Sequence, residues 1–96
     1  VTLVRNNNIA EFPDAVTSRG NKHLNELIEA KKKGYQAYML YLIQIQGCDS
    51  FKIANDIDPE YKIMFDKALK NKVKILCYDC KLSNKEIIIN KEIFYD

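Results

Sequence analysis

The sequence lacks several features that would decide a class of protein at once. No apolar run approaches the ~20 residues of a membrane-spanning helix, so a membrane protein is not expected. Lys and Arg number 15 against 13 Asp and Glu, and this excess is too small to indicate nucleic-acid binding from composition. Internal repeats and low-complexity segments are missing. The 96 residues suffice for one small domain.

A disulfide framework and a zinc site are also poorly supported. The three cysteines are an odd number, which favours reduced thiols in a cytoplasmic protein. Cys77 and Cys80 have the spacing of a zinc or redox pair, but a second pair and a neighbouring histidine are lacking. Residues three apart on a strand also point to opposite faces, so we interpret this motif as part of a strand.

The most informative stretch is residues 12–27, FPDAVTSRGNKHLNEL. Thr17 or Ser18 can cap a helix by accepting from backbone N–H groups two or three residues further on. The helix is predicted from about Arg19 to Lys33. Gly34 follows it, at the position where a left-handed residue commonly ends a helix.

Helical periodicity divides this helix into two sides. The side that should face the core carries Leu24, Leu27 and Ile28. The polar side carries Arg19, Lys22, His23 and Glu26. Because crowding cations at the positive end of a helix dipole costs repulsion, we interpret Arg19 and Lys22 as phosphate contacts, with His23 as a further donor. The alternatives are a solvated helix face with a Lys22–Glu26 ion pair, and a structural role for His23.

Two further polar residues are candidates for a site. Asp14 could ligate a divalent ion through its carboxylate, or accept from backbone N–H groups as a turn residue. Tyr35 to Gln46 is the clearest strand, and its apolar residues on both faces predict a central strand covered on both sides. Gln44 lies where this strand ends, which is a common position for sites in open α/β sheets. Its alternative is a strand that emerges into water.

The remaining elements are predicted from turn signals and periodicity. Val1–Val4 and Ile9–Phe12 form the arms of a hairpin around an Asn-rich turn. Residues 47–56 are predicted as a loop, and Asp58-Pro59-Glu60 begins a second helix. The apolar positions of that helix, which should pack on the sheet, are Ile57, Tyr61, Met64, Phe65, Ala68 and Leu69.

Val73–Tyr78 is predicted as a second inner strand. A strand, helix and strand with tight connections form a right-handed crossover, so this strand should be parallel to the strand at 35–46. Residues 86–89 and 93–95 are predicted as a terminal hairpin or an edge strand. The fold class is therefore α/β, with a mixed sheet of four to six strands and flanking helices.

Residues 12–27, together with Asp56-Ile57-Asp58-Pro59, resemble the sugar fermentation stimulation protein A (SfsA) family, and the resemblance extends in order over nearly the whole chain. It implies a restriction-endonuclease-like domain of the PD-(D/E)xK type. Residues 1–96 would be the C-terminal part of that domain, and we expect a fragment. An OB-like domain and a strand with an acidic-x-Lys element would lie upstream of Val1.

The resemblance implies a bacterial DNA-binding protein without strong sequence preference, tied to regulation of sugar metabolism. Its phosphate-binding residues would be Thr17, Arg19, Lys22 and His23. Asp14, His23 and Gln44 would be catalytic residues beside a Mg²⁺ site that the full-length protein completes, with Asp14 as a ligand; no cofactor is expected for these residues alone. The alternatives are a Mg²⁺-dependent DNA nuclease when full length, and a small-molecule or protein-binding regulator. An unpaired strand edge at Val1–Val4 predicts self-association.

Overall fold

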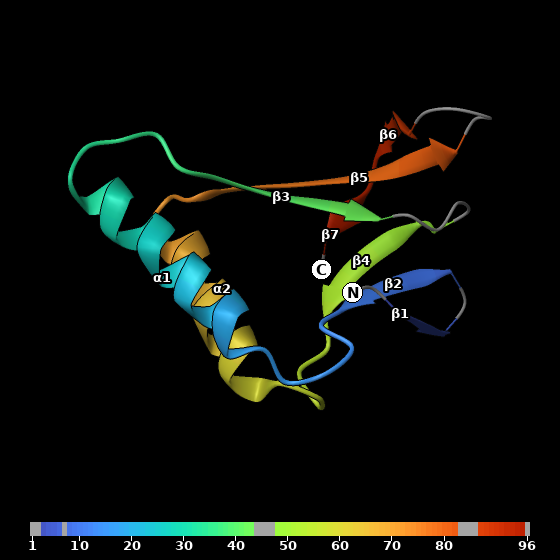
Figure 1. Ribbon diagram of the computed structural model, residues 1–96, viewed down its shortest axis with the longest axis horizontal. Coiled ribbons are helices and arrows are strands. Elements are labelled where there is room, and N and C mark those ends of the chain that lie inside the picture. Colours follow the sequence, from blue (N-terminus) through green and yellow to red (C-terminus); the bar gives the residue numbers. More distant parts are fainter. Residues whose placement is uncertain (1–2, 7, 44–47, 83–86, 96) are drawn as a thin grey trace.

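The computed structural model places two neighbouring helices beside two small β-sheets (Figure 1). It describes residues 3–6, 8–43, 48–82 and 87–95. The mixed α/β fold expected from the sequence is confirmed. The elements are β1 (Leu3–Asn6), β2 (Ile9–Phe12), α1 (Ser18–Lys32), β3 (Tyr38–Ile43), β4 (Ser50–Ile53), α2 (Pro59–Lys70), β5 (Lys74–Leu82), β6 (Ile87–Glu92) and β7 (Phe94–Tyr95).

The strands form a four-stranded sheet in the order β1-β2-β4-β7 and a three-stranded sheet in the order β3-β5-β6. β1 and β2 are antiparallel, as the predicted hairpin requires. β3 and β5 are parallel with continuous register from Tyr38↔Lys74 to Ile43↔Asp79, which confirms the predicted parallel pairing of these strands. The sheets are held together by one hydrophobic core that both helices share.

Three details of the prediction were wrong. Residues 47–56 were expected to be a loop, but Ser50–Ile53 forms β4. Phe51 and Ile53 are its buried residues, and two alternating apolar positions are too few to predict a strand from the sequence. Of the two alternatives for residues 86–89 and 93–95, the hairpin was wrong, because β6 and β7 do not pair with each other; each is instead an edge strand, β6 of the three-stranded sheet and β7 of the four-stranded one. Finally, β3 is not covered on both sides: Tyr41 and Ile43 are buried, whereas Leu40 and Leu42 on the opposite face are each more than two-fifths exposed.

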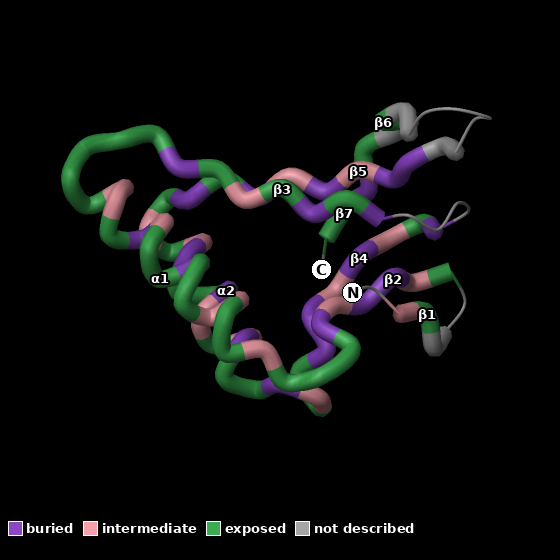
Figure 2. The backbone as a smooth tube through the Cα atoms, in the orientation of Figure 1, coloured by how far each residue is buried: buried purple, intermediate pink, exposed green. Residues whose placement is uncertain are grey.

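The core is centred on a cluster of aromatic rings that joins both sheets to α2. Tyr41 is its middle member, with ring centroids 4.8 Å from Phe51, 5.7 Å from Phe12 and 6.1 Å from Phe65. The Tyr41 and Tyr61 hydroxyls share a buried hydrogen bond. Burial raises the pKa of Tyr61 to about 12, and burial beside Tyr61 raises the pKa of Tyr41 further. Both hydroxyls therefore stay protonated at neutral pH. Figure 2 shows that buried residues alternate with exposed ones in the second half of β3 and with half-buried ones along β5.

All three cysteines are buried and none of them forms a disulfide; Cys48 is buried although it lies in the segment predicted as a loop. Burial, with a smaller effect of the Glu92 carboxylate, raises the pKa of Cys77 to about 12. The part of the chain that the structure describes contains no group of three or more His, Cys, Asp or Glu residues that could hold a metal ion. Within the same residues, no helix is long and apolar enough to cross a membrane.

The strand edge expected to self-associate lies at the border of the four-stranded sheet. β1 pairs with β2 on one side and is an edge strand of this sheet. Val4 is 41% exposed there, whereas Val1 and Thr2 lie outside the described residues. Self-association through this edge stays a prediction.

Candidate phosphate-binding groove

The starts of α1 and α2 are joined by the buried carboxylate of Asp58. Its Oδ1 accepts from the N–H of Tyr61 at 3.1 Å, which caps α2 as the sequence predicted. Its Oδ2 accepts from the N–H of Thr17 at 2.9 Å, across 41 residues of sequence. Thr17 in turn caps α1, because its Oγ1 accepts from the N–H of Gly20 at 3.0 Å. One carboxylate therefore fixes the first turns of both helices.

Gly20 lets the first turn of α1 pack closely on α2. A Cβ atom at this position would lie 2.9 Å from Cε1 of Tyr61 and 2.9 Å from Cγ2 of Thr17, closer than van der Waals contact allows. There is therefore no room for a side chain at position 20, where α1 faces Tyr61 of α2. Arg19, the residue before it, projects outward from the same turn.

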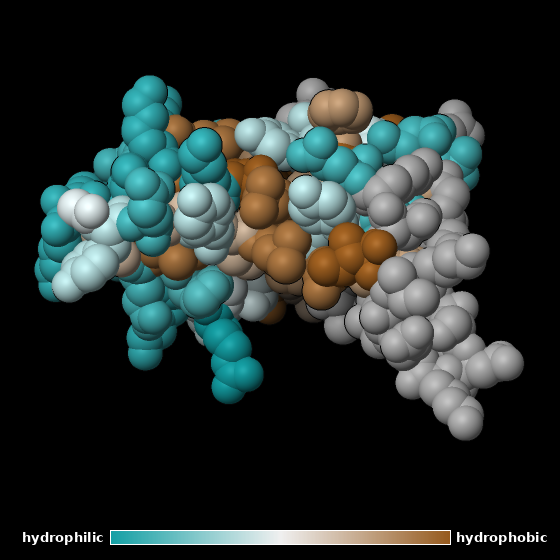
Figure 3. Space-filling view, turned by 90° about the horizontal axis from the view of Figure 1, so that it is seen from above, coloured by the Kyte–Doolittle hydropathy of each residue, from teal (hydrophilic) through white to brown (hydrophobic). Residues whose placement is uncertain are grey.

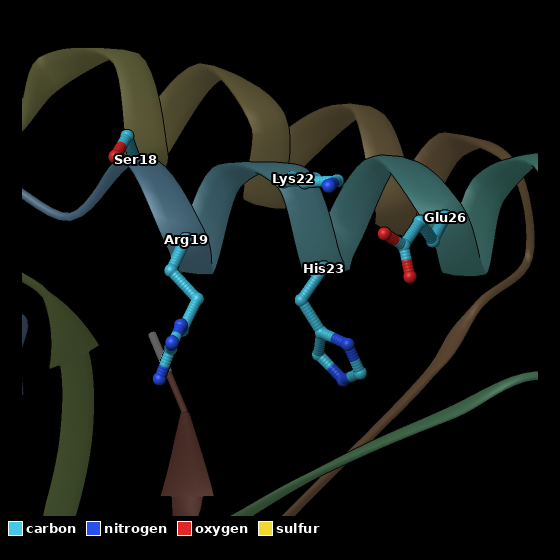
Figure 4. Close-up of a pocket in the computed structure, with 5 residues that line it drawn as sticks. All are labelled: Ser18, Arg19, Lys22, His23 and Glu26. Carbon is cyan, nitrogen blue, oxygen red and sulfur yellow. The ribbon is translucent and has the colours of Figure 1, made fainter.

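An open groove of about 460 Å³ lies along the exposed side chains of the first half of α1. It is lined by Ser18, Arg19, Lys22, His23 and Glu26. Figure 4 shows that Arg19 and His23 extend together from one side of the helix, one turn apart, while Lys22 leaves from the turn between them in another direction. The cationic residues predicted from the sequence thus line a single hollow, with Arg19 and His23 sharing a direction.

The cations of the groove are not neutralised by the acids nearest to them. Among the residues that the structure describes, neither Arg19 nor Lys22 forms an ion pair, and the Lys22–Glu26 pair considered from the sequence is not formed. Glu26 lines the far end of the groove, one turn beyond Lys22 (Figure 4). The arrangement offers a guanidinium and an imidazole side by side, which can donate to an anion such as a phosphate.

The other predicted site residues are placed differently. Thr17 does not line the groove, because its hydroxyl and its backbone are used to cap α1 and to reach Asp58. Asp14 is exposed in the turn that precedes α1 and has an interaction within the chain. Gln44 lies outside the described residues. The groove therefore unites Arg19, Lys22 and His23, but not Thr17.

Sequence reasoning missed two features of this region. Ser18 was considered only as a helix cap, yet it lines the groove as the first residue of α1. Asp58 was predicted as the cap of α2 alone, and its bond to Thr17 was not foreseen. The Asp-Pro signal marks a helix start, but no local pattern can show that a distant N–H shares the same carboxylate.

Comparison with known proteins agrees with the resemblance seen in the sequence. The family described as the sugar fermentation stimulation protein RE domain matches residues 1–86. The chain belongs to the SfsA family. A sugar fermentation stimulation protein homolog from Pelagibacter ubique is 58% identical over 93 residues, covering 97% of this chain and 40% of that protein. The homolog from Rhodospirillum centenum is 45% identical over 93 residues, with the same two coverages.

A solved structure supports the fold of this SfsA chain. The structure of Pyrococcus furiosus SfsA in complex with Ca²⁺ matches with a TM-score of 0.89 and 25% sequence identity, covering 99% of this chain and 42% of that one. The chain thus spans about two-fifths of the length of the relatives that it matches.

Proposed function

We propose that this chain supplies part of the DNA-binding surface of an SfsA-family protein, and that the groove on α1 binds backbone phosphates. The observation that carries the proposal is the groove itself, in which Arg19, Lys22 and His23 share one hollow without ion-pair partners among the described residues. Arg can hold a phosphate with two parallel hydrogen bonds, and Lys adds a point charge.

Binding through phosphates has two consequences. Sequence preference should be weak, because phosphates carry no direct sequence information. Affinity should fall steeply with salt, with a slope of log K against log[salt] of roughly −0.9 for each phosphate contacted on a duplex. Glu26 opposes the binding of an anion, so it should limit affinity.

The proposal is tested with the full-length protein and two unrelated duplex oligonucleotides, by fluorescence anisotropy across a salt series. The double change Arg19→Ala and Lys22→Ala should weaken binding to both duplexes and make the salt slope shallower by about 2. Glu26→Gln should strengthen binding a few-fold. Lys62→Ala, on the exposed side of α2 and outside the groove, is the matched control.

Unchanged affinity and slope in the double variant would contradict the proposal. That outcome would favour a small-molecule or protein-binding regulator, the remaining alternative from the sequence. The link to sugar metabolism also stays a prediction. It would be tested by comparing sugar-fermentation phenotypes of cells that carry the wild-type protein or the double variant.

A second candidate function is a metal-dependent nuclease, because the solved SfsA of P. furiosus is a complex with Ca²⁺. The described residues of this chain do not by themselves fit such a centre: they hold no metal-binding group of three or more, and Asp14 supplies a single exposed carboxylate. Any metal would therefore need further ligands from outside the described residues.

The nuclease candidate is tested by incubating the full-length protein with plasmid DNA in Mg²⁺ and in EDTA. Cleavage that requires Mg²⁺ would support it, and Asp14→Asn should then raise the Mg²⁺ concentration needed for half-maximal rate. Intact plasmid with every divalent ion tried, alongside normal binding, would leave a DNA-binding protein without nuclease activity.

A further inference from the structure

The small net charge of the chain hides a strong separation of charge along the sequence. Residues 30–48 and 67–78 contain seven lysines and no Asp or Glu. The rest of the chain contains eight basic residues against all thirteen acidic ones. The seven lysines are Lys31, Lys32, Lys33, Lys67, Lys70, Lys72 and Lys74.

The fold brings the lysine-bearing parts of these segments, residues 31–33 and 67–74, together at one end of the molecule. α1 and α2 start beside Asp58 and end on the same side, at the left of Figure 1. The loops that follow them meet there, since the N–H of Lys74 donates to the carbonyl of Ala37 at 3.0 Å and β5 begins opposite Tyr38. We call this surface, formed by the seven lysines with Tyr35 and Tyr38, the lysine end.

Helix stabilisation explains only part of this cluster. Cations near the last turns of α1 and α2 favour the negative ends of the helix dipoles. Lys72 and Lys74, however, lie beyond the end of α2. Lys72 even has a φ of 68°, a left-handed conformation that Gly or Asn adopts more readily than Lys. Among the described residues, Lys32 alone of the seven forms an ion pair, with Glu29 (Nζ to Oε1, 3.7 Å).

Two exposed aromatic side chains lie among the lysines. Tyr35 is 66% exposed in the loop after α1, and Tyr38 is 52% exposed at the start of β3, in register with Lys74. Figure 3 shows hydrophilic side chains gathered at this end, next to an apolar strip in the middle of the view. Exposed aromatic rings among cations are what proteins use to stack unpaired bases while they hold the backbone.

We propose that the lysine end binds single-stranded nucleic acid, with Tyr35 and Tyr38 as stacking platforms and the lysines on the phosphates. Bases in a duplex are already stacked on one another, so the tyrosines should add affinity for single strands only. The lysines should attract both forms through the same phosphate chemistry.

This surface is separate from the groove on α1. The groove lies at the start of the helix and the lysine end at its finish, with Glu26 and Glu29 on the exposed turns between them. Binding at the lysine end does not depend on the groove, so the two proposals can fail independently.

The test measures anisotropy of the full-length protein with a single-stranded oligonucleotide and with the matching duplex. The paired change Tyr35→Ser and Tyr38→Thr should weaken single-strand binding about 5-fold or more and leave duplex binding and both salt slopes unchanged. Phe94→Ser, which removes an aromatic ring that is 76% exposed on β7, is the matched control. The triple change Lys33→Gln, Lys72→Asn and Lys74→Thr should make the single-strand salt slope shallower by about 2.

Several results would overturn the proposal. One is an equal loss of single-strand and duplex binding in the tyrosine variant, and another is no loss in either. A third is an unchanged salt slope in the lysine variant. A lowered melting temperature of the full-length tyrosine variant with normal single-strand binding would instead assign these rings to internal packing. Because Arg19→Ala and Lys22→Ala spare the lysine end, that variant run in parallel separates failure of the groove from failure of this surface.

Discussion

The two ends of the helix pair are built in opposite ways. At the starting end, one buried carboxylate accepts from the backbone N–H groups of Thr17 and Tyr61 and ties two distant segments together. At the finishing end, each helix is closed by backbone bonds of its own last turn, through Lys33 and Asn71, and the charges face water. The first end is a buried connection between the two helices, which we call the joint, and the second end is a solvated surface. Stability should therefore respond strongly to changes at the first end and weakly at the second.

The largest effect should come from removing the joint itself. Asp58→Ala deletes both acceptors and leaves two backbone donors without partners, which should lower the free energy of unfolding by about 3 kcal/mol. Asp58→Asn keeps one acceptor oxygen and should lose about half as much. Asp66→Ala removes an exposed carboxylate from the same helix and should change stability by less than about 0.5 kcal/mol. Urea denaturation measures the free energy of unfolding of all three variants. Equal decreases for Asp58→Ala and Asp66→Ala would show that the hydrogen bonds of Asp58 to Thr17 and Tyr61 contribute no more than an exposed carboxylate does.

The next effect concerns the tyrosine pair, whose Tyr61 lies in the first turn of α2. Tyr61→Phe leaves the buried Tyr41 hydroxyl without its partner and should cost about 1–3 kcal/mol. Changing both tyrosines to Phe removes donor and acceptor together, so the double variant should cost less than the sum of the single ones. Additive losses would show that the hydroxyls do not interact.

The same pair predicts a dependence on pH. Because the pKa of Tyr61 rises from 10.0 to about 12 on folding, the unfolded chain ionises first. The stabilisation is therefore complete below pH 10 and is lost between pH 10 and 12, by about 2–3 kcal/mol. The double Phe variant should lose less over that range, as measured by denaturation at pH 9 and pH 11. Identical pH profiles for the two proteins would contradict the burial of these hydroxyls.

A smaller effect tests the close approach of the helices at the joint. Gly20→Ala should lower stability by about 1–2 kcal/mol, since its Cβ would meet Tyr61 and the gain in helix propensity does not offset the clash. Shortening Tyr61 to Leu should remove much of this cost. Gly34→Ala, at the finishing end, meets no atom within 4 Å and should suffer only from its φ of +95°, independently of residue 61. Thermal denaturation of Gly20→Ala and Gly34→Ala, each with and without Tyr61→Leu and compared with Tyr61→Leu alone, distinguishes contact from backbone strain.

The contrast also separates what the sequence could predict from what it could not. Both helix starts were predicted, because Thr17 and Asp58 act on backbone groups within three residues. The bond between Asp58 and Thr17 was not, since a carboxylate does not reveal in sequence which remote donor it will meet. β4 was missed because four residues carry too short an alternation. The exposed face of β3 was mispredicted because apolar residues indicate burial without specifying what covers them.

The smallest effect is expected at the finishing end. Lys70→Gln removes one cation from the last turn of α2 and should cost only about 0.3–1 kcal/mol at low salt, because a solvated charge interacts weakly with the helix dipole. Since this interaction is screened, the difference from wild type should vanish near 1 M salt, whereas the cost of Asp58→Ala should persist. Denaturation curves at two salt concentrations measure both. A decrease in the free energy of unfolding for Lys70→Gln that is large and independent of salt would contradict this contrast. It would mean that the finishing end also depends on a buried polar interaction, as the starting end does.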